Sequence, residues 1–280
     1  MTSHRIIASI LFVLAAAPAQ ATECPTLFLG GRPPEVAQES LAAKTRPLCF
    51  KAFSVLHSGV TRTALWSAER LTRDSVGDAR SMERVNTFKA EMRLPATERA
   101  ELSDYSRSGF DRGHLAPSGD MPDPEAQDES FSLANMIPQD PDNNRNLWAA
   151  IETAVRDLAI RSGEVYVVTG PIFSGTDLKA LRGRVLVPTH LFKAVYDGRT
   201  RRAGAYIAEN VPGFGWKAVT LLELQGYTGI DVFPALPAQA KASLMDLPVP
   251  RPRAAKSTPS NESAGSVAWD LAKRAMKVWQ

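Results

Sequence analysis

Residues 111–114 place a carboxylate, a guanidinium, a glycine and an imidazole in four consecutive positions, as Asp111, Arg112, Gly113 and His114. Soluble cores rarely contain Asp, Arg and His side by side, because each is costly to bury without a partner. The group therefore favours a functional site on a loop or strand edge. A local ion pair between Asp111 and Arg112, beside a buried imidazole with satisfied nitrogens, is the purely structural alternative.

Several of these side chains have properties that suit hydrolysis of a phosphodiester. A histidine such as His114 has a neutral fraction near neutral pH and can take a proton from water. The planar fork of donors on Arg112 suits phosphate oxygens. Downstream, Asn144 and Glu152 offer oxygen ligands, and Mg²⁺ needs only one or two protein ligands because it keeps several waters. The set predicts a metal on the leaving-group side and a His-activated water on the other.

The downstream residues also have simpler explanations. Asn144 would serve well as a helix N-cap, and Glu152 and Arg156 have the i, i+4 spacing of an ordinary helix pair. Other hydrolytic chemistries lack their motifs here. The chain has no His-Glu-x-x-His or Cys-x-x-Cys metal motif, no Gly-x-Ser-x-Gly turn and no Gly-x-x-x-x-Gly-Lys phosphate loop.

A helix from about Asn144 to about Arg161 is predicted to carry the downstream residues. Apolar residues recur along it at spacings of four, four and three, which gives one buried stripe: Leu147, Ile151, Val155 and Leu158. A second row runs along the flank of the same helix: Asn144, Trp148, Glu152 and Arg156.

Strands are expected around this helix. Strand-like patterns occur at residues 48–56, 63–66, 165–169, 185–188, 191–196 and 203–207, whereas 219–224 fits strand or helix. Residues 67–109 are polar and predict surface loops with one short helix.

The two ends of the chain differ in composition from the main domain, which we place at residues 22–247. Residues 1–21 have a basic start, an apolar run and a small-x-small cleavage pattern, so they predict a secretory signal peptide. The apolar run is shorter than the roughly 20 residues that span a bilayer, which argues against a membrane anchor. Residues 248–265 predict a flexible linker, and 266–280 an amphipathic helix that packs on the domain or meets a membrane or partner.

Cys24 and Cys49 are the only cysteines, and both follow the expected cleavage site. Export would permit a disulfide between them, while two free thiols or a thiol nucleophile are the alternatives. The net charge of +3 does not by itself indicate a nucleic-acid-binding protein.

The order of the motifs resembles the DNA/RNA non-specific endonuclease family, which includes secreted bacterial nucleases and mitochondrial endonuclease G. The resemblance rests on Asp-Arg-Gly-His-Leu-Ala-Pro, then Asn-Met-Ile-Pro-Gln, then Asn-Arg-x-x-Trp-x-x-x-Glu, and it runs from about Cys49 to about Leu236. It implies an α+β, ββα-metal fold, in which a central, mostly antiparallel sheet is flanked by helices and long loops.

The resemblance also implies roles for individual residues. His114 would be the general base, Asn144 the single direct protein ligand of Mg²⁺, and Glu152 the holder of a metal-bound water. Arg112 would stabilise charge in the transition state. Further residues would support the site: Asp111, Asn135 and Arg156.

We therefore expect an exported, Mg²⁺-dependent enzyme, periplasmic or secreted, that cleaves single- and double-stranded DNA and RNA, with Mn²⁺ as a substitute metal. Arg107, Arg112, Arg145 and Arg156 are candidate phosphate contacts. The family resemblance also allows a homodimer and an inhibitor protein as partners. The competing hypotheses are a catalytically silent nucleic-acid-binding module and a small-molecule phosphodiesterase.

Overall fold

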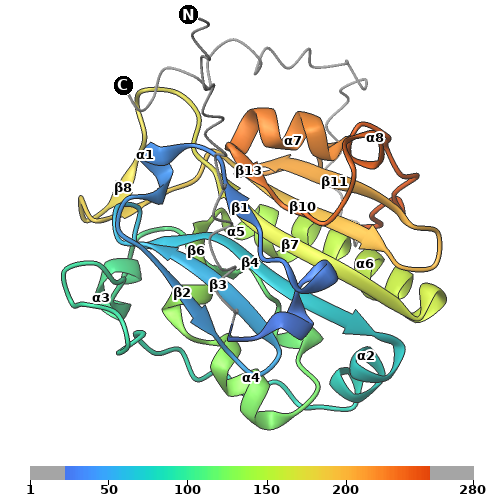
Figure 1. Ribbon diagram of the computed structural model, residues 1–280. Coiled ribbons are helices and arrows are strands. Elements are labelled where there is room, and N and C mark those ends of the chain that lie inside the picture. The colour runs from blue at the N-terminus through green and yellow to red at the C-terminus, as the bar shows by residue number, and fades with distance from the viewer. Residues whose placement is uncertain (1–22, 253–280) are drawn as a thin grey trace, which may run out of the picture.

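A seven-stranded antiparallel sheet forms the centre of the protein, as seen in the computed structural model, which describes residues 23–252 (Figure 1). The predicted signal peptide, residues 253–265 of the predicted linker and the predicted C-terminal helix lie outside the described residues. In order across the sheet the strands are β12 (Trp216–Val219), β11 (Arg202–Glu209), β10 (His190–Asp197), β7 (Glu164–Ile172), β4 (Thr63–Thr72), β3 (Phe53–Ser58) and β2 (Thr45–Cys49).

Each face of this sheet is covered by a separate apolar cluster. On one face α6 (Ala149–Ser162) and α2 (Arg73–Arg80) pack over β4, β7 and β10. On the other face lie α7 (Leu221–Thr228), the N-terminal segment and the small sheet of β1 (Glu35–Val36) and β13 (Ile230–Asp231) (Figure 1). Because both faces are covered, β4 and β10 are buried at nearly every position rather than at alternate positions.

A smaller β-pair followed by a helix completes the predicted ββα unit. β5 (Asp111–His114) pairs antiparallel with β6 (Met136–Gln139), with His114 opposite Met136. The chain then enters α5 (Pro141–Asn143), a π-helical segment η5 (Asn144–Trp148), and α6. The expected histidine-bearing strand and asparagine-bearing helix are therefore both present. The expected apolar stripe of this helix is buried: Leu147, Ile151, Val155 and Leu158.

The helix begins three residues earlier than the sequence indicated. Asp140 is its N-cap, and its carboxylate accepts hydrogen bonds from the backbone N–H groups of Asp142 and Asn143 at 2.9 and 3.0 Å. Proline follows the cap at the first helical position, where its missing N–H costs nothing. Asn144 is thus inside the helix, and the N-cap explanation for this residue is wrong.

The prediction of surface loops throughout residues 67–109 was wrong for its first part. β4 continues to Thr72, and Thr72 then caps α2 through a reciprocal pair of bonds with Ser75. The sequence did not indicate helix α2 because only two of its residues, Val76 and Ala79, are buried, which leaves no apolar stripe.

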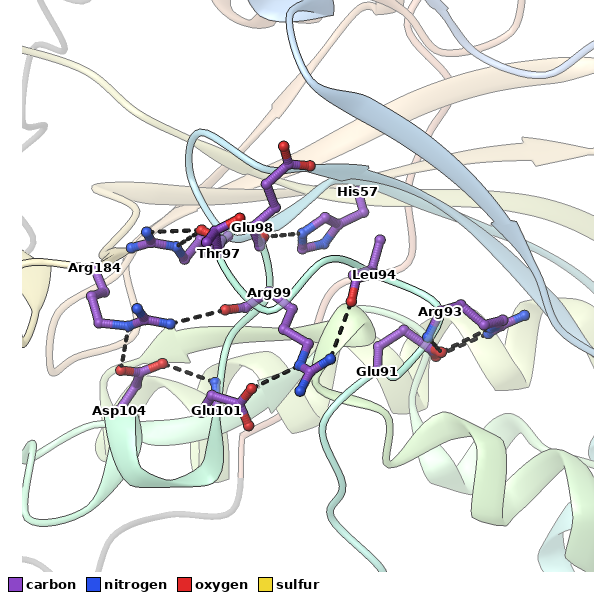
Figure 2. A network of polar contacts seen from close by, with 11 residues as sticks. His57, Glu91, Arg93, Leu94, Thr97, Glu98, Arg99, Glu101, Asp104 and Arg184 are labelled. Atoms are coloured by element: carbon purple, nitrogen blue, oxygen red, sulfur yellow. Dashed lines mark hydrogen bonds and ion pairs between the residues drawn. The ribbon is translucent and has the colours of Figure 1, made fainter.

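The rest of that region is irregular apart from the short helix α3 (Leu102–Tyr105), but hydrogen bonds fix it to the domain (Figure 2). A ring nitrogen of His57 lies 2.8 Å from the carbonyl of Glu98, and Arg184 pairs with Asp104 at 3.0 Å. Arg99 donates to Glu101 and to the carbonyl of Leu94. These contacts fix the path of the chain into β5.

Shorter elements complete the described chain: η1 (Pro25–Leu27), η2 (Leu29–Gly31), α1 (Glu39–Ala42), η3 (Ser118–Asp120), α4 (Pro124–Ser130), η4 (Leu133–Asn135), β8 (Ala180–Leu181), β9 (Val185–Leu186) and α8 (Ala238–Lys241). The ambiguous segment 219–224 contains the end of β12 and the start of α7. A disulfide joins Cys24 to Cys49 with a Cα–Cα distance of 6.1 Å, so the predicted bridge is confirmed. Within residues 23–252, no helix combines the length and apolar character needed to cross a membrane.

Candidate active site

Asp111 connects β5 to the helix that carries Asn144. Its two carboxylate oxygens accept hydrogen bonds from Arg145 at 2.7 and 2.9 Å, and one of them also accepts the amide N–H of Asn144 at 2.9 Å. The alternative of a local pair between Asp111 and Arg112 is therefore wrong. Because the amide nitrogen of Asn144 is engaged by a carboxylate, its side-chain oxygen is left available to a cation.

His114 lies against two aromatic rings and is 8% exposed. The centroids of Phe131 and Phe88 lie 5.0 and 5.9 Å from the imidazole. Its Nε2 is buried and has no hydrogen-bond partner. The structural alternative predicted a buried imidazole whose nitrogens are hydrogen-bonded, and only the burial is found. Burial, assisted by the positive charge of Arg84, lowers the pKa of His114 to about 3. The ring is therefore neutral and able to accept a proton at physiological pH.

Two guanidinium groups flank this aromatic site. Arg112 stacks on Phe88 with its central carbon 4.0 Å from the ring centroid, and Arg84 lies over Phe131 at 5.3 Å. Within residues 23–252 the guanidinium of Arg112 makes no hydrogen bond, so its donors are free for an anion. Sequence reasoning missed Arg84, which lies 27 positions before the motif in an irregular segment with no recognisable spacing.

Glu152 lies two helical turns beyond Asn144 and is only partly exposed. Burial raises its pKa to about 7, against the opposing effects of nearby cations, of which Arg156 is the largest. In the described part of the chain its carboxylate makes no hydrogen bond or ion pair. Arg84 acts on the pKa of both His114 and Glu152, so both groups lie within the electrostatic reach of one side chain.

Asn135 is fully buried and holds the chain that follows His114. Its side-chain oxygen accepts from the N–H of Ala116 at 3.0 Å, and its amide nitrogen donates to the carbonyls of Ala116 and Ser130. Both hydrogen-bonding ends of the amide are thus used within the protein. The residue fixes the strand that carries the histidine and does not face a substrate.

Arg156 makes its ion pair with Asp120 rather than with Glu152. One guanidinium nitrogen donates to the Asp120 carboxylate at 2.6 Å and the other donates to Thr153 at 3.1 Å. Arg156 is only 17% exposed, so it has less freedom to reach a phosphate than Arg145, whose side chain is 68% exposed. Arg107 is exposed in the turn after α3, where it lines a surface hollow with Lys179 and Arg182.

A buried pair of charges lies under the helix and had no signal in the sequence. Lys193 on β10 and Glu69 on β4 are each 1% exposed, with 3.9 Å between the ammonium and the nearer carboxylate oxygen. Lys193 also donates to Thr169 at 2.6 Å. Burial raises the pKa of Glu69 well above its usual value, and the negative charge of Asp120 adds to the effect. Lys193 falls in the predicted strand 191–196, whereas Glu69 falls in the region 67–109 that was expected to form surface loops.

The residues at the site fit a hard divalent cation held mainly through water. No group of three or more His, Cys, Asp or Glu side chains that could hold a metal occurs between residues 23 and 252. What the site offers is the free amide oxygen of Asn144 and the unengaged carboxylate of Glu152. This donor set suits Mg²⁺, which retains several waters, and does not suit zinc, which prefers nitrogen and sulfur ligands.

A β-pair carrying a neutral histidine, joined to a helix with an asparagine and a glutamate, defines a nuclease of the ββα-metal class. The chain matches the DNA/RNA non-specific endonuclease family over residues 33–239 and belongs to it. It is accordingly an enzyme that hydrolyses nucleic acids, in a family of metal-dependent nucleases.

Named relatives and a solved structure agree with this assignment. The chain is 31% identical to a nuclease of Nostoc sp., over 81% of this chain and 90% of the relative. It is 38% identical to nuclease C1 of Cunninghamella echinulata var. echinulata, over 57% and 69% of the two chains. A crystal structure of the EndoG/EndoGI complex contains a similar chain, with a TM-score of 0.63 and 25% identity, covering 69% of this chain and 88% of that one.

Proposed function

We propose that this protein is an exported, Mg²⁺-dependent endonuclease that cleaves both DNA and RNA, with His114 as the general base. The observation that carries the proposal is a neutral, unpartnered imidazole between two arginines, beside a helix with a free amide oxygen and a free carboxylate. Mn²⁺ is expected to replace Mg²⁺, because both accept oxygen ligands.

In this mechanism His114 takes a proton from the attacking water, and the free donors of Arg112 stabilise the charge that develops on the phosphate. Asn144 would hold the cation through its oxygen, and Glu152 would orient a water bound to it. When bound, Mg²⁺ supplies positive charge on the leaving-group side. Asp111 positions Asn144, and Asn135 positions the strand of His114.

A free base with a pKa of about 3 is weak, and the substrate itself is expected to strengthen it. Part of the lowering comes from the positive charge of Arg84. A phosphate held by Arg84 would neutralise that charge and raise the proton affinity of the imidazole. Arg84 therefore joins Arg107, Arg145 and Arg156 as a proposed phosphate contact. Contacts of this kind carry no sequence information, so discrimination between bases should be weak.

The catalytic assignment is tested by plasmid degradation with purified protein, with and without a chelator. His114→Ala should lower the rate about 10²–10⁴-fold, the usual cost of losing a general base. His57→Ala, which removes a buried imidazole on β3, is the matched control and should stay far more active per folded molecule. Unchanged cleavage by a folded His114→Ala protein would remove the mechanism.

The metal assignment is tested by titrating Mg²⁺ into Asn144→Ala and following both cleavage and thermal stabilisation. The variant should need a much higher Mg²⁺ concentration for both readouts. Asn146→Ala removes an amide from the same helical segment, one that bonds Asp142 instead, and should titrate like the parent. If Asn144→Ala also titrates like the parent, the ligand is another residue.

The two competing hypotheses predict different results in the same assays. A silent binding module would shift DNA in a gel without cutting it in the presence of Mg²⁺. A small-molecule phosphodiesterase would hydrolyse a nitrophenyl phosphodiester at least as well as long DNA. The unpartnered imidazole of His114 and the free carboxylate of Glu152 favour an enzyme over a silent binding module.

Export and partners are proposed on separate grounds. The apolar start of the chain and the Cys24–Cys49 disulfide both support a periplasmic or secreted protein, which cell fractionation would test. The similar chain in the EndoG/EndoGI complex supports the proposal of an inhibitor protein. We also propose a homodimer, which sedimentation of the purified protein would test.

A further inference from the structure

A groove of about 720 Å³ follows the outward face of the active-site helix. It starts at Arg145, next to Asn144, and reaches Arg161 near the end of α6. The opposite wall is formed by the C-terminal segment, through Pro248, Val249 and Arg251. We call this hollow the α6 groove. Sixteen residues of helix separate Arg145 from Arg161, so the groove is about 24 Å long.

The charged side chains of the α6 groove make it positive. Its one carboxylate, Asp157, is neutralised by an ion pair with Arg80 at 2.7 Å. Arg161 and Arg251, at the far end of the groove, make no ion pair within residues 23–252, although Arg161 also lines an adjoining hollow with Asp197 and Asp246. A concave surface with one sign of charge concentrates ligands of the opposite sign.

The C-terminal wall is held firmly by contacts with β11. The N–H of Met245 donates to the carbonyl of Ala203 at 2.8 Å, and the hydroxyl of Tyr206 donates to the carbonyl of Pro248 at 2.7 Å. Leu247 is buried in the core cluster under α6. Arg251 thus follows an anchored segment. The family match ends at residue 239, so this wall is a feature of the present chain beyond the matched region.

We propose that the α6 groove binds the sugar–phosphate backbone of the nucleic acid on one side of the cleaved bond, with Arg161 and Arg251 as contacts remote from the reaction. This inference rests on the proposed function. A groove of this length would follow several successive phosphates of one strand, which a short substrate does not have. The exposed side chain of Val249, at 69%, offers an apolar contact to the sugars between the phosphates.

The groove predicts a difference between long and short substrates. Arg161→Glu/Arg251→Glu should raise the KM for long duplex DNA about tenfold or more at 0.1 M salt and leave kcat nearly unchanged. Hydrolysis of a nitrophenyl phosphodiester, which is too short to enter the groove, should match the parent. The slope of log affinity against log salt should fall by about 0.9 for each phosphate that the variant no longer neutralises.

Arg201→Glu is the matched control, because Arg201 is exposed in the turn between β10 and β11 and does not line the groove. A double variant that binds and cleaves long DNA like the parent, or no worse than Arg201→Glu, would overturn the proposal. A groove variant that loses activity equally on both substrates would also overturn it.

A binding measurement separates this inference from the proposed function. Fluorescence anisotropy of a labelled 20-base-pair duplex is recorded with chelator present, so that no cleavage is needed. If the parent binds through Arg161 and Arg251 but does not cut when Mg²⁺ is added, the groove stands and the proposed function fails. If the parent cuts but the charge reversals leave binding unchanged, the groove assignment alone fails.

Discussion

The low pKa of His114 makes the stability of the protein depend on pH in a predictable direction. Burial, with a contribution from Arg84, lowers this pKa from 6.5 to about 3 in the folded protein. Between these two values the unfolded chain binds a proton that the folded chain does not. The contribution of His114 to the free energy of unfolding is therefore fully present above pH 6.5 and is lost as the pH falls toward 3.

The size of the effect follows from the shift. Each pKa unit corresponds to about 1.4 kcal/mol, and pH 5 lies about 1.5 units below the ordinary pKa of the imidazole. The free energy of unfolding should thus lose about 2 kcal/mol through His114 between pH 7.5 and pH 5. His57 and His190 also have lowered pKa values, so only a comparison of variants isolates this contribution.

The assay is urea unfolding of the parent and His114→Gln at several pH values from 7.5 to 5. Glutamine does not titrate, so the variant should lose about 2 kcal/mol less than the parent over this range. Phe131→Leu is the control, because it disturbs packing against the same ring and removes no titrating group. Parallel pH profiles for the parent and His114→Gln would refute the reasoning, because the folded and unfolded proteins would then bind protons equally at this position.

Three further predictions concern the surroundings of the site and are checked by urea unfolding. Gly113→Ala should cost about 1–3 kcal/mol by overpacking, because its new Cβ would lie 2.6 Å from the Cβ of Gln139; an unchanged midpoint would show that Gln139 moves freely. Lys193→Met should cost about 3–5 kcal/mol, because it leaves the buried Glu69 carboxyl without its cationic partner, and adding Glu69→Leu should restore most of it. Equal stability of the single and double variants would contradict the pairing. Asn135→Ala should cost on the order of 3 kcal/mol, because it leaves buried backbone groups without partners; a loss below about 1 kcal/mol would mean that water replaces the amide.

The sequence by itself determined the family and the chemical inventory of the site. Short-range motifs predicted His114 and Asn144 as site residues, because the residues that carry the family resemblance lie in compact, ordered segments of the chain. The stripe from Leu147 to Leu158 predicted the helix, since the spacing of apolar residues directly reports which face is buried. Two cysteines allowed one bridge, and the fold contains it.

Only the tertiary structure decided which charged groups meet. Asp111 pairs with Arg145, 34 positions away, rather than with its neighbour Arg112. Alternation along β5 directs adjacent side chains to opposite sides, so neighbours in sequence need not pair.

Contacts between distant segments also explain which residues were missed from the sequence. Arg84 and Phe131 reach His114 from an irregular segment and from the end of α4, and neither position carries a periodic signal. The pairing of Lys193 with Glu69 was missed because Glu69 was expected in a surface loop, and because a strand pattern does not reveal which residue lies across the sheet. The spacing of apolar residues along the sequence indicates which side chains are buried. The contacts that those side chains make depend on strand register and on packing between distant segments.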